Sequence, residues 1–455
     1  MDEKKLKSVS RMKEEIAIFE PVLAALRADP GEMGHLQAYL IENLLDNHRR
    51  IISCVEEGTP FLASQYTNPV EILTAMDVPW YFHVQQQFAA GGTGGSVHTE
   101  EDLEEMDRLG IPSDCCTLLR LLLYYQAAGL LPIPAAYLAL TEPCDGVAGL
   151  HAAFMNHPDW RDVPVFCPDP PYHDDPRAYG YYAGELKRMV EFITRHTGKA
   201  LDMDRLKEVV AETNRGYELW FEYAYLRRAV PTPHSYVMPM SCFYILNTGG
   251  AGDPRHTQWY RGMVANAEAR IRQTRPEVPH QKVRLLWYDI QPLFFGELVP
   301  WLEQEWGAVI CMDMVSYCPY ELIDTSSEDA MFLGLAKRAL NHSPMIHQAR
   351  GLAANAIEDI TRIVRDYRID CVVFPGHMGH KDMAATTSLA REACRELGVP
   401  FRYIGMDICD KRYTSVEEIK EKVSRFFAVM KPGELAREAW PSVRVPGDVS
   451  HRLPA

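Results

Sequence analysis

The stretch that most constrains the fold covers residues 370–413 and predicts a strand, a loop, a helix and a second strand. The first apolar run ends at Pro375-Gly376, helical spacing follows over 383–397, and a second apolar run at 401–406 ends at Asp407. Two strands joined by a helix are parallel with a right-handed crossover. Such sheets bind ligands outside the carboxyl ends of their strands. The candidate binding residues at this edge are His377, His380, Lys381 and Asp407.

Size and charge narrow the class of protein. A chain of 455 residues predicts two or three domains. A net charge of −15 without a long Lys/Arg run argues against a nucleic-acid partner. No apolar run reaches the ~18 residues of a membrane span, and the first residues lack the apolar segment of a secretory signal. We therefore expect a cytoplasmic protein with neither a nucleic-acid nor a membrane partner.

Strands alternate with helices in two parts of the chain, which predicts an α/β fold with doubly wound parallel sheets. The glycine-rich stretch at 91–95 lacks the spacing of a phosphate-binding loop and is predicted to be a flexible loop. The predicted ranges are a helical N-terminal segment at 1–55, a first α/β lobe at 56–170, a helical connector at 171–240, a second α/β lobe at 241–432 and a peripheral tail at 433–455.

Residues with useful chemistry follow the predicted strands of both lobes. They are Gln65, Cys144 and Cys167 in the first lobe, and Asp289, His377, His380 and Asp407 in the second. Cys115 or Cys116 would join them from a helix start, where the helix dipole stabilises a thiolate and Asp114 is the predicted N-cap. If the lobes face each other, these loops converge on one cleft. Thiolates with an imidazole or carboxylate there suit iron–sulfur or zinc chemistry.

Two alternatives to a metal site were weighed against the same residues: surface turns with unreactive cysteines, and a serine nucleophile. The loops are equally consistent with surface turns and buried, unreactive cysteines. The eleven cysteines contain no CxxC, so any metal ligands must come from separate loops. No GxSxG occurs, so nothing marks a serine nucleophile. Within the first lobe, a helix is predicted at 70–76, with Pro69 in its first turn and Glu71 near its positive end.

Four segments in order resemble the 2-hydroxyacyl-CoA dehydratase family, of the 2-hydroxyglutaryl-CoA dehydratase D-component type, which also includes the subunits of ATP-dependent benzoyl-CoA reductase. They are NPVEILTAMDVPWYF, PSDCCTLLRLLL, TEPCDGVAGL and CVVFPGHMGHKDM with GVPFRYIGMDICDKRY. The resemblance implies two Rossmann-like lobes, a homologous second subunit and an acyl-CoA substrate. It also implies a [4Fe–4S] cluster in the cleft, and an ATP-dependent activator with its own iron–sulfur cluster that delivers one electron to form a ketyl radical.

The resemblance also suggests roles for single residues. Cys116 and Cys144 match positions at which members of the family carry cysteines, while Gln65 and His380 stand where many members have further cysteines. Cys116, Cys144 and His380 are therefore the expected cluster ligands. The expected substrate-binding residues are Gln65, Glu71, His377, Lys381 and Asp407. Three functions follow: a dehydratase-type subunit with a cluster, a subunit that reduces an aromatic ring, or a cluster-free structural subunit that supports a catalytic partner.

Overall fold

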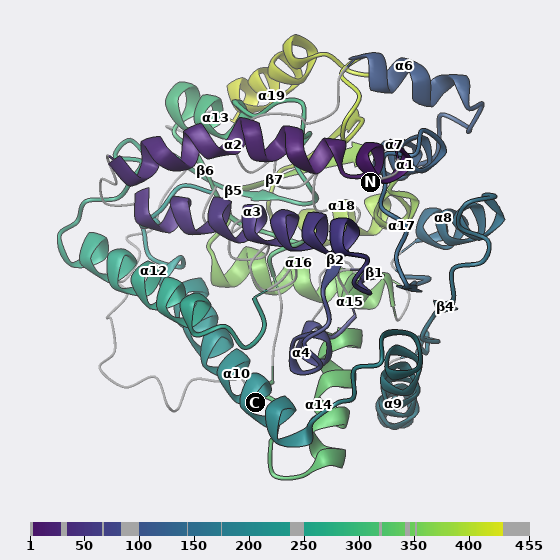
Figure 1. Ribbon diagram of the computed structural model, residues 1–455. Helices are drawn as coiled ribbons and strands as arrows, with labels where there is room; N and C mark the ends of the chain where they lie inside the picture. Colours follow the sequence, from purple (N-terminus) through teal and green to yellow (C-terminus); the bar gives the residue numbers. More distant parts are fainter. Residues whose placement is uncertain are drawn as a thin grey trace.

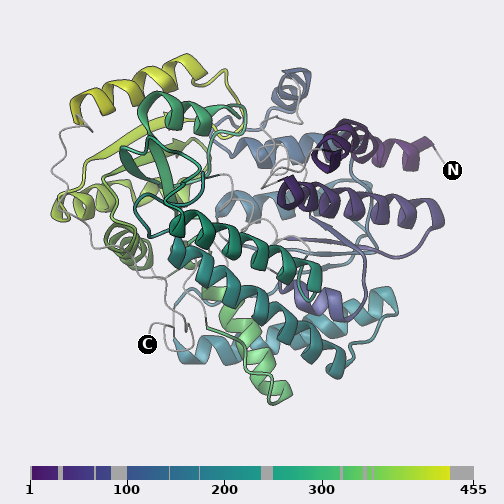
Figure 2. The same ribbon diagram turned by 90° about the vertical axis from the view of Figure 1, so that its left-hand side faces the viewer.

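The computed structural model of the protein contains two sheets, each of four parallel strands. The strand order is β2-β1-β3-β4 in the first sheet and β6-β5-β7-β8 in the second. Figure 2 shows the first lobe in purple and blue beside the second in green and yellow, which confirms the predicted α/β class. The structure describes residues 3–28, 34–65, 68–82, 100–142, 144–173, 175–236, 250–317, 321–341, 346–350 and 353–430. The predicted loop at 91–95 and the predicted tail at 433–455 lie outside these ranges.

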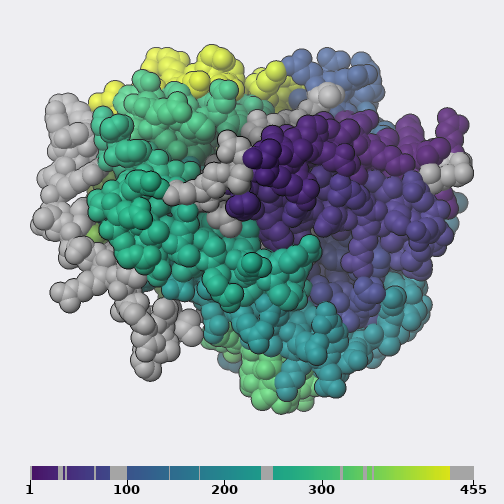
Figure 3. Space-filling view, turned by 60° about the vertical axis from the view of Figure 1, so that its left-hand side comes forward, coloured from purple at the N-terminus to yellow at the C-terminus, as the bar shows by residue number. Residues whose placement is uncertain are grey.

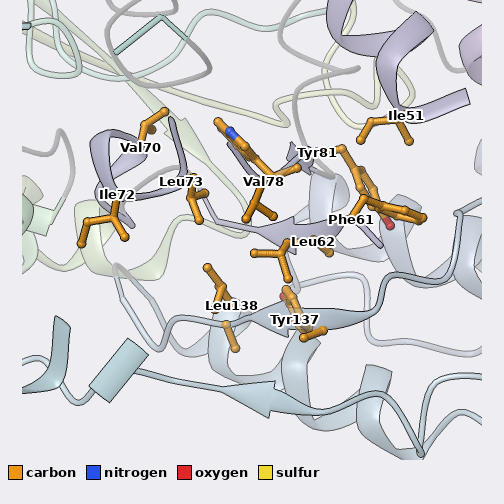
Figure 4. Packing of buried hydrophobic residues seen from close by; sticks show 14 of the residues in the cluster. Ile51, Phe61, Leu62, Val70, Ile72, Leu73, Val78, Tyr81, Tyr137 and Leu138 are labelled. Carbon is orange, nitrogen blue, oxygen red and sulfur yellow. The ribbon is translucent and has the colours of Figure 1, made fainter. Parts of the chain in front are cut away.

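The first sheet is short, and its two central strands are buried while its edge strand β4 is partly exposed. Its strands are β1 (Leu62–Ser64), β2 (Trp80–Phe82), β3 (Ala136–Leu138) and β4 (Val165–Phe166), and its helices are α4 (Val70–Ala75), α6 (Glu100–Arg108), α7 (Thr117–Ala127) and α8 (Asp145–Asn156). Every residue of β1 and β3 is buried, as expected for parallel strands with helices on both faces. Figure 4 shows Leu62 of β1 packed near Tyr137 and Leu138 of β3. Pro69 is the N-cap of α4, one position before the predicted first turn.

The second sheet buries alternate residues of β5 in two separate apolar clusters. Its strands are β5 (Val283–Trp287), β6 (Ala308–Asp313), β7 (Cys371–His377) and β8 (Phe401–Met406), and its helices are α13 (Leu298–Trp306), α14 (Glu328–Asn341), α15 (Ile346–Ala349), α16 (Ala354–Asp366), α17 (Lys381–Ala385), α18 (Thr387–Glu396) and α19 (Val416–Met430). Leu285 packs with residues of α13 and α19, whereas Leu286 packs with residues of α16 and α18. Because neighbouring side chains of a strand point to opposite faces, helices cover both sides of this sheet.

The remaining helices lie outside the two sheets. They are α1 (Glu3–Ser8), α2 (Ser10–Ala28) and α3 (Gly34–Glu57) near the N-terminus, and α9 (Pro176–Thr197), α10 (Met203–Leu226) and α12 (Pro254–Arg272), which follow β4 and precede β5 in the chain. The helices α2 and α3 lie side by side and are joined by a buried pair between Glu15 and His48 (Figure 1). Figure 3 shows α12 beneath them, where Tyr39 Oη hydrogen-bonds with His256 Nδ1 at 2.5 Å. None of the described helices is long and apolar enough to cross a membrane.

The helix α14 belongs to one lobe by sequence and packs into the core of the other. It lies within the predicted second lobe at 241–432, but it packs against α9 (Figure 1). Its buried residues Phe332, Leu335 and Leu340 belong to the same apolar cluster as Leu62 of β1 and Tyr137 of β3. The core around the first sheet therefore needs a helix that follows β6 in the chain.

Candidate functional site

Every strand of the second sheet ends next to an ionisable side chain. Asp289 follows β5, Asp313 ends β6, His377 ends β7 and Asp407 follows β8, and their exposed fractions are between 0% and 4%. Because the sheet order is β6-β5-β7-β8, these groups form a buried row in the order Asp313, Asp289, His377, Asp407 along its carboxyl edge. This is the edge at which parallel sheets bind ligands.

His380 is held by Asp289 at the centre of this edge. The ring nitrogen Nδ1 of His380 hydrogen-bonds with Asp289 Oδ2 at 2.9 Å. Burial acts to lower the pKa of His380, but the charge and hydrogen bond of Asp289, followed by a hydrogen bond with the Cys116 thiol, raise it well above its ordinary value. Burial acts to raise the pKa of Asp289, and the charge and hydrogen bond of His380 lower it overall. Each charge therefore stabilises the other: Asp289 favours the protonated imidazole, and His380 favours the ionised carboxyl.

Cys116 belongs to the first lobe and lies directly against the loop that carries His380. It is the N-cap of α7 and is 4% exposed. A Cβ atom added at Gly379 would lie 2.0 Å from the Cα of Cys116, so only glycine allows this approach. Cys115 is only partly buried. We call the site formed by Cys116, Gly379 and His380 the lobe contact; the predicted cleft is closed at this point.

The prediction that Asp114 caps this helix is wrong. The helix α7 begins at Thr117, so the cap position falls on Cys116, two residues further along the chain. Asp114 instead pairs with Lys381 Nζ at 3.3 Å, across the lobe contact. An exposed lysine of the other lobe is a partner that local sequence cannot reveal.

Cys144 lies near the lobe contact at the start of a second helix. It is the N-cap of α8, and Figure 1 shows α7, α8 and α17 close together. Burial raises the pKa of Cys144 to about 12, helped by the charge of Asp382. Burial also raises the pKa of the Asp382 carboxyl, whose two buried oxygens have no hydrogen bond of good geometry. Asp382 was not predicted, although it lies two residues beyond His380.

Asp407 also faces the first lobe, which is the position predicted for it. Its Oδ2 accepts a hydrogen bond of 2.8 Å from Thr117 Oγ1, and its Oδ1 accepts from the amides of Cys409 and Asp410. The buried Cys409 thiol is close enough to Cys116 to feel its charge, and sequence analysis missed it. A search for polar residues just beyond each strand would have included it.

The other predicted substrate-binding residues have different partners. Gln65 Nε2 donates to Tyr137 Oη at 3.0 Å, and Glu71 forms a buried ion pair with Arg338 of α14. Lys381 is exposed and pairs with Asp114 and Asp145. His377 donates from Nε2 to the carbonyl of Ile290, and its ring centre lies 5.2 Å from that of His380. The structure thus gathers Cys116, Cys144, His377, His380, Lys381 and Asp407, while Gln65 and Glu71 bond elsewhere.

The donor set at the lobe contact does not fit a [4Fe–4S] cluster. Such a cluster is normally held by four thiolates. Within the described ranges, no group of three or more His, Cys, Asp and Glu side chains is arranged to hold a metal ion. The Nδ1 atom of His380 is already bonded to Asp289, and the backbones of Gly379 and Cys116 are in direct contact. A cluster therefore cannot lie between the backbones of these two residues.

Comparison with known proteins identifies a family. The sequence model of the family described as 2-hydroxyglutaryl-CoA dehydratase, D-component, matches residues 65–430. No curated protein matches the chain significantly. The matched region begins directly after β1 and ends with α19, so it contains the whole second lobe, the first lobe from Gln65 onward and the whole lobe contact.

Proposed function

The chain belongs to the 2-hydroxyglutaryl-CoA dehydratase D-component family, and we propose on this basis that it is a subunit of a 2-hydroxyacyl-CoA dehydratase-type enzyme. The observation that carries the proposal is the family match over residues 65–430, which spans both lobes. A D-component is one component of a dehydratase, so a partner subunit is part of the proposal. The substrate class is a CoA thioester of a 2-hydroxy acid.

The carboxyl edge of the second sheet is the proposed place of the substrate. Elimination of water requires one group to take a proton and another to protonate the departing hydroxyl. Asp289 and Asp382 are two nearby carboxyls whose pKa values are shifted in opposite directions, a pattern that separates an acid from a base. Lys381 is an exposed cation at the same edge, suited to a phosphate of CoA.

The iron–sulfur cluster implied for the enzyme is assigned in this proposal to other members of the complex. The lobe contact offers a single thiol beside an imidazole that is already bonded to Asp289, so the proposal places the cluster outside this chain. The chain would then form one wall of the active site and supply acid–base groups. No contact in the described ranges favours reduction of an aromatic ring over elimination of water.

The proposal is tested by purification without oxygen, of the chain alone and in complex with its partner subunit. We expect negligible iron and acid-labile sulfide in the chain alone and about four irons in the complex. With the reduced activator and ATP, the complex should convert a 2-hydroxyacyl-CoA to the 2-enoyl-CoA. About four irons in the isolated chain, lost in Cys116→Ser, would return the cluster to this subunit. A complex loaded with its cluster and activator that forms no enoyl product would contradict the dehydratase function.

A further inference from the structure

A cavity of about 410 Å³ lies in the first lobe, at the end of the sheet opposite to its carboxyl edge. Phe61 and Ala135 line it, and they directly precede β1 and β3, so the cavity lies at the amino ends of these parallel strands. Gln65 directly follows β1, at the other end of the same strand. Cavities of about 300–1,000 Å³ are the usual size of small-molecule sites.

The floor of the cavity is apolar and supported from behind. Phe61, Leu131 and Trp160 line it and are between 3% and 5% exposed. The ring of Trp160 packs against that of Phe154, with centres 5.0 Å apart, and the ring of Phe61 lies 6.0 Å from that of Tyr81 (Figure 4). Because neighbouring rings fix these side chains, the floor keeps its shape before a ligand arrives.

The mouth of the cavity carries an excess of positive charge. Lys4, Lys5 and Asp159 line the cavity and are exposed. Lys4 Nζ pairs with Asp159 Oδ1 at 2.6 Å. Among the described residues that line the cavity, the charged groups are thus two ammonium groups and one carboxylate. One positive charge is left over at the mouth, which favours a ligand with one negative charge.

The apolar surface of the cavity continues to its rim. Ile133 lines the cavity and is 41% exposed, and the neighbouring lining residue Pro60 is also exposed. An apolar rim beside an apolar floor offers a continuous surface to a ligand that has an apolar body.

We propose that this cavity binds a small monoanion with an apolar body, of the class of medium-chain carboxylates. The chain lies on Phe61, Leu131 and Trp160, and the carboxylate lies beside Lys5 at the mouth. Apolar contact supplies most of the affinity, and the lysine selects the sign of the charge. The single unbalanced charge favours a monoanion over the several phosphate charges of CoA. The inference does not depend on the proposed function, because none of the described residues that line the cavity belongs to the lobe contact or to the carboxyl edge of the second sheet.

The test uses the full chain and octanoate, with Cys54 as a reporter inside the cavity. Cys54 lines the cavity and is 6% exposed, so iodoacetamide reaches its thiol through the mouth. Calorimetry should find one octanoate bound per chain. At about ten times its Kd, octanoate should slow the modification of Cys54 about 10-fold, because roughly one cavity in eleven is then empty. The exposed thiol of Cys167 is the internal control, and its rate should not change.

Two matched comparisons test the charge. Octanol and octylamine carry the same chain with a neutral or a positive end, and each should protect Cys54 less than octanoate does. Lys5→Gln should weaken octanoate binding about 2- to 5-fold and leave octanol binding unchanged. Ile133→Asp adds a carboxylate at the rim and should weaken octanoate binding more than Ile133→Asn, a side chain of the same size. Lys5 and Ile133 are both exposed, so these variants should fold.

The result in the native sequence decides the proposal even if a variant fails to fold. Octanoate that does not bind, or that binds without protecting Cys54, would overturn the site. Equal protection by octylamine would overturn the assignment of an anion. A Cys54 thiol that does not react in the free chain would show that the cavity is closed to small molecules and would also overturn the proposal. These outcomes leave the dehydratase function untouched, because it is tested by enoyl product.

Discussion

Replacement of Gly379 by alanine should force the lobes apart at a known point. The new Cβ would lie 2.0 Å from the Cα and 2.2 Å from the N of Cys116, and both are backbone atoms that cannot turn aside. Ordinary contact begins at 3.4 Å, so the loop and α7 must move apart by about 1.4 Å. Overpacking of this kind typically costs about 1–3 kcal/mol. The movement should also open a path for solvent to the buried side chain of Cys116.

Two measurements test this prediction. Denaturant unfolding should show the free energy of unfolding of Gly379→Ala lowered by about 1–3 kcal/mol, and iodoacetamide should modify Cys116 faster than in the native sequence. The matched control is Gly180→Ala, at an exposed position of α9 where an added Cβ meets nothing within 4 Å. The control should gain about 0.5–1 kcal/mol, because alanine favours a helix over glycine. Equal stability of the two variants, with Cys116 still protected, would refute the direct contact between the lobes.

Three further predictions follow from the buried and exposed ion pairs. Asp289→Asn should destabilise the protein most between about pH 4 and 6.5, where the carboxylate and the protonated imidazole of His380 are both present. The difference in unfolding free energy between the wild type and the variant should shrink as the pH rises through the elevated pKa of His380, because that pKa falls without the carboxylate. Arg338→Met should cost about 3–5 kcal/mol of unfolding free energy, because it leaves Glu71 buried and unpaired. The exposed pair of Lys381 and Asp114 spans the lobe contact that buries Cys116. Raising NaCl from 0.1 to 1 M shortens the screening length from about 10 to about 3 Å and weakens this pair, so iodoacetamide should modify Cys116 faster at high salt.

The predictions for Arg338→Met and for added salt each have a control in the same chain. A solvent-exposed pair joins Arg205 and Glu208 at 2.9 Å, and Arg205→Met should change stability by at most about 1 kcal/mol. The exposed Cys167 should react with iodoacetamide at a rate that salt hardly changes. If Arg338→Met is no more destabilising than Arg205→Met, the pair with Glu71 does not hold α4 to α14. If the wild type and Asp289→Asn show the same dependence on pH, His380 does not titrate against this carboxylate.

The parallel strands could be predicted from sequence because their signals are local. The run at 401–406 and the glycine at 398 specify a strand and a helix end without reference to the rest of the chain. The polar residues at strand ends were also predictable, since the carboxyl edge of a parallel sheet is a property of the topology. Asp407 faces the other lobe as the prediction required.

The remaining features depend on contacts between distant segments. The cap of α7 falls on Cys116 rather than Asp114, and Asp114 pairs instead with Lys381, about 270 residues away. Gln65 stands at a strand end as predicted, yet its amide bonds to Tyr137 of the neighbouring strand. Periodicity places residues on a face of a helix or strand but does not select the partner that this face meets.

The position of α14 has a consequence for the synthesis of the protein. The strand β4 ends at Phe166, whereas α14 ends at Asn341, which is 175 residues later. At about 5–20 residues per second, a ribosome needs roughly 9 to 35 s to cover this distance. During that time the first sheet has emerged, but the surface that Phe332 and Leu335 will cover is still open to water. A nascent chain in this state exposes apolar surface and is a natural client for chaperones that hold it until α14 arrives.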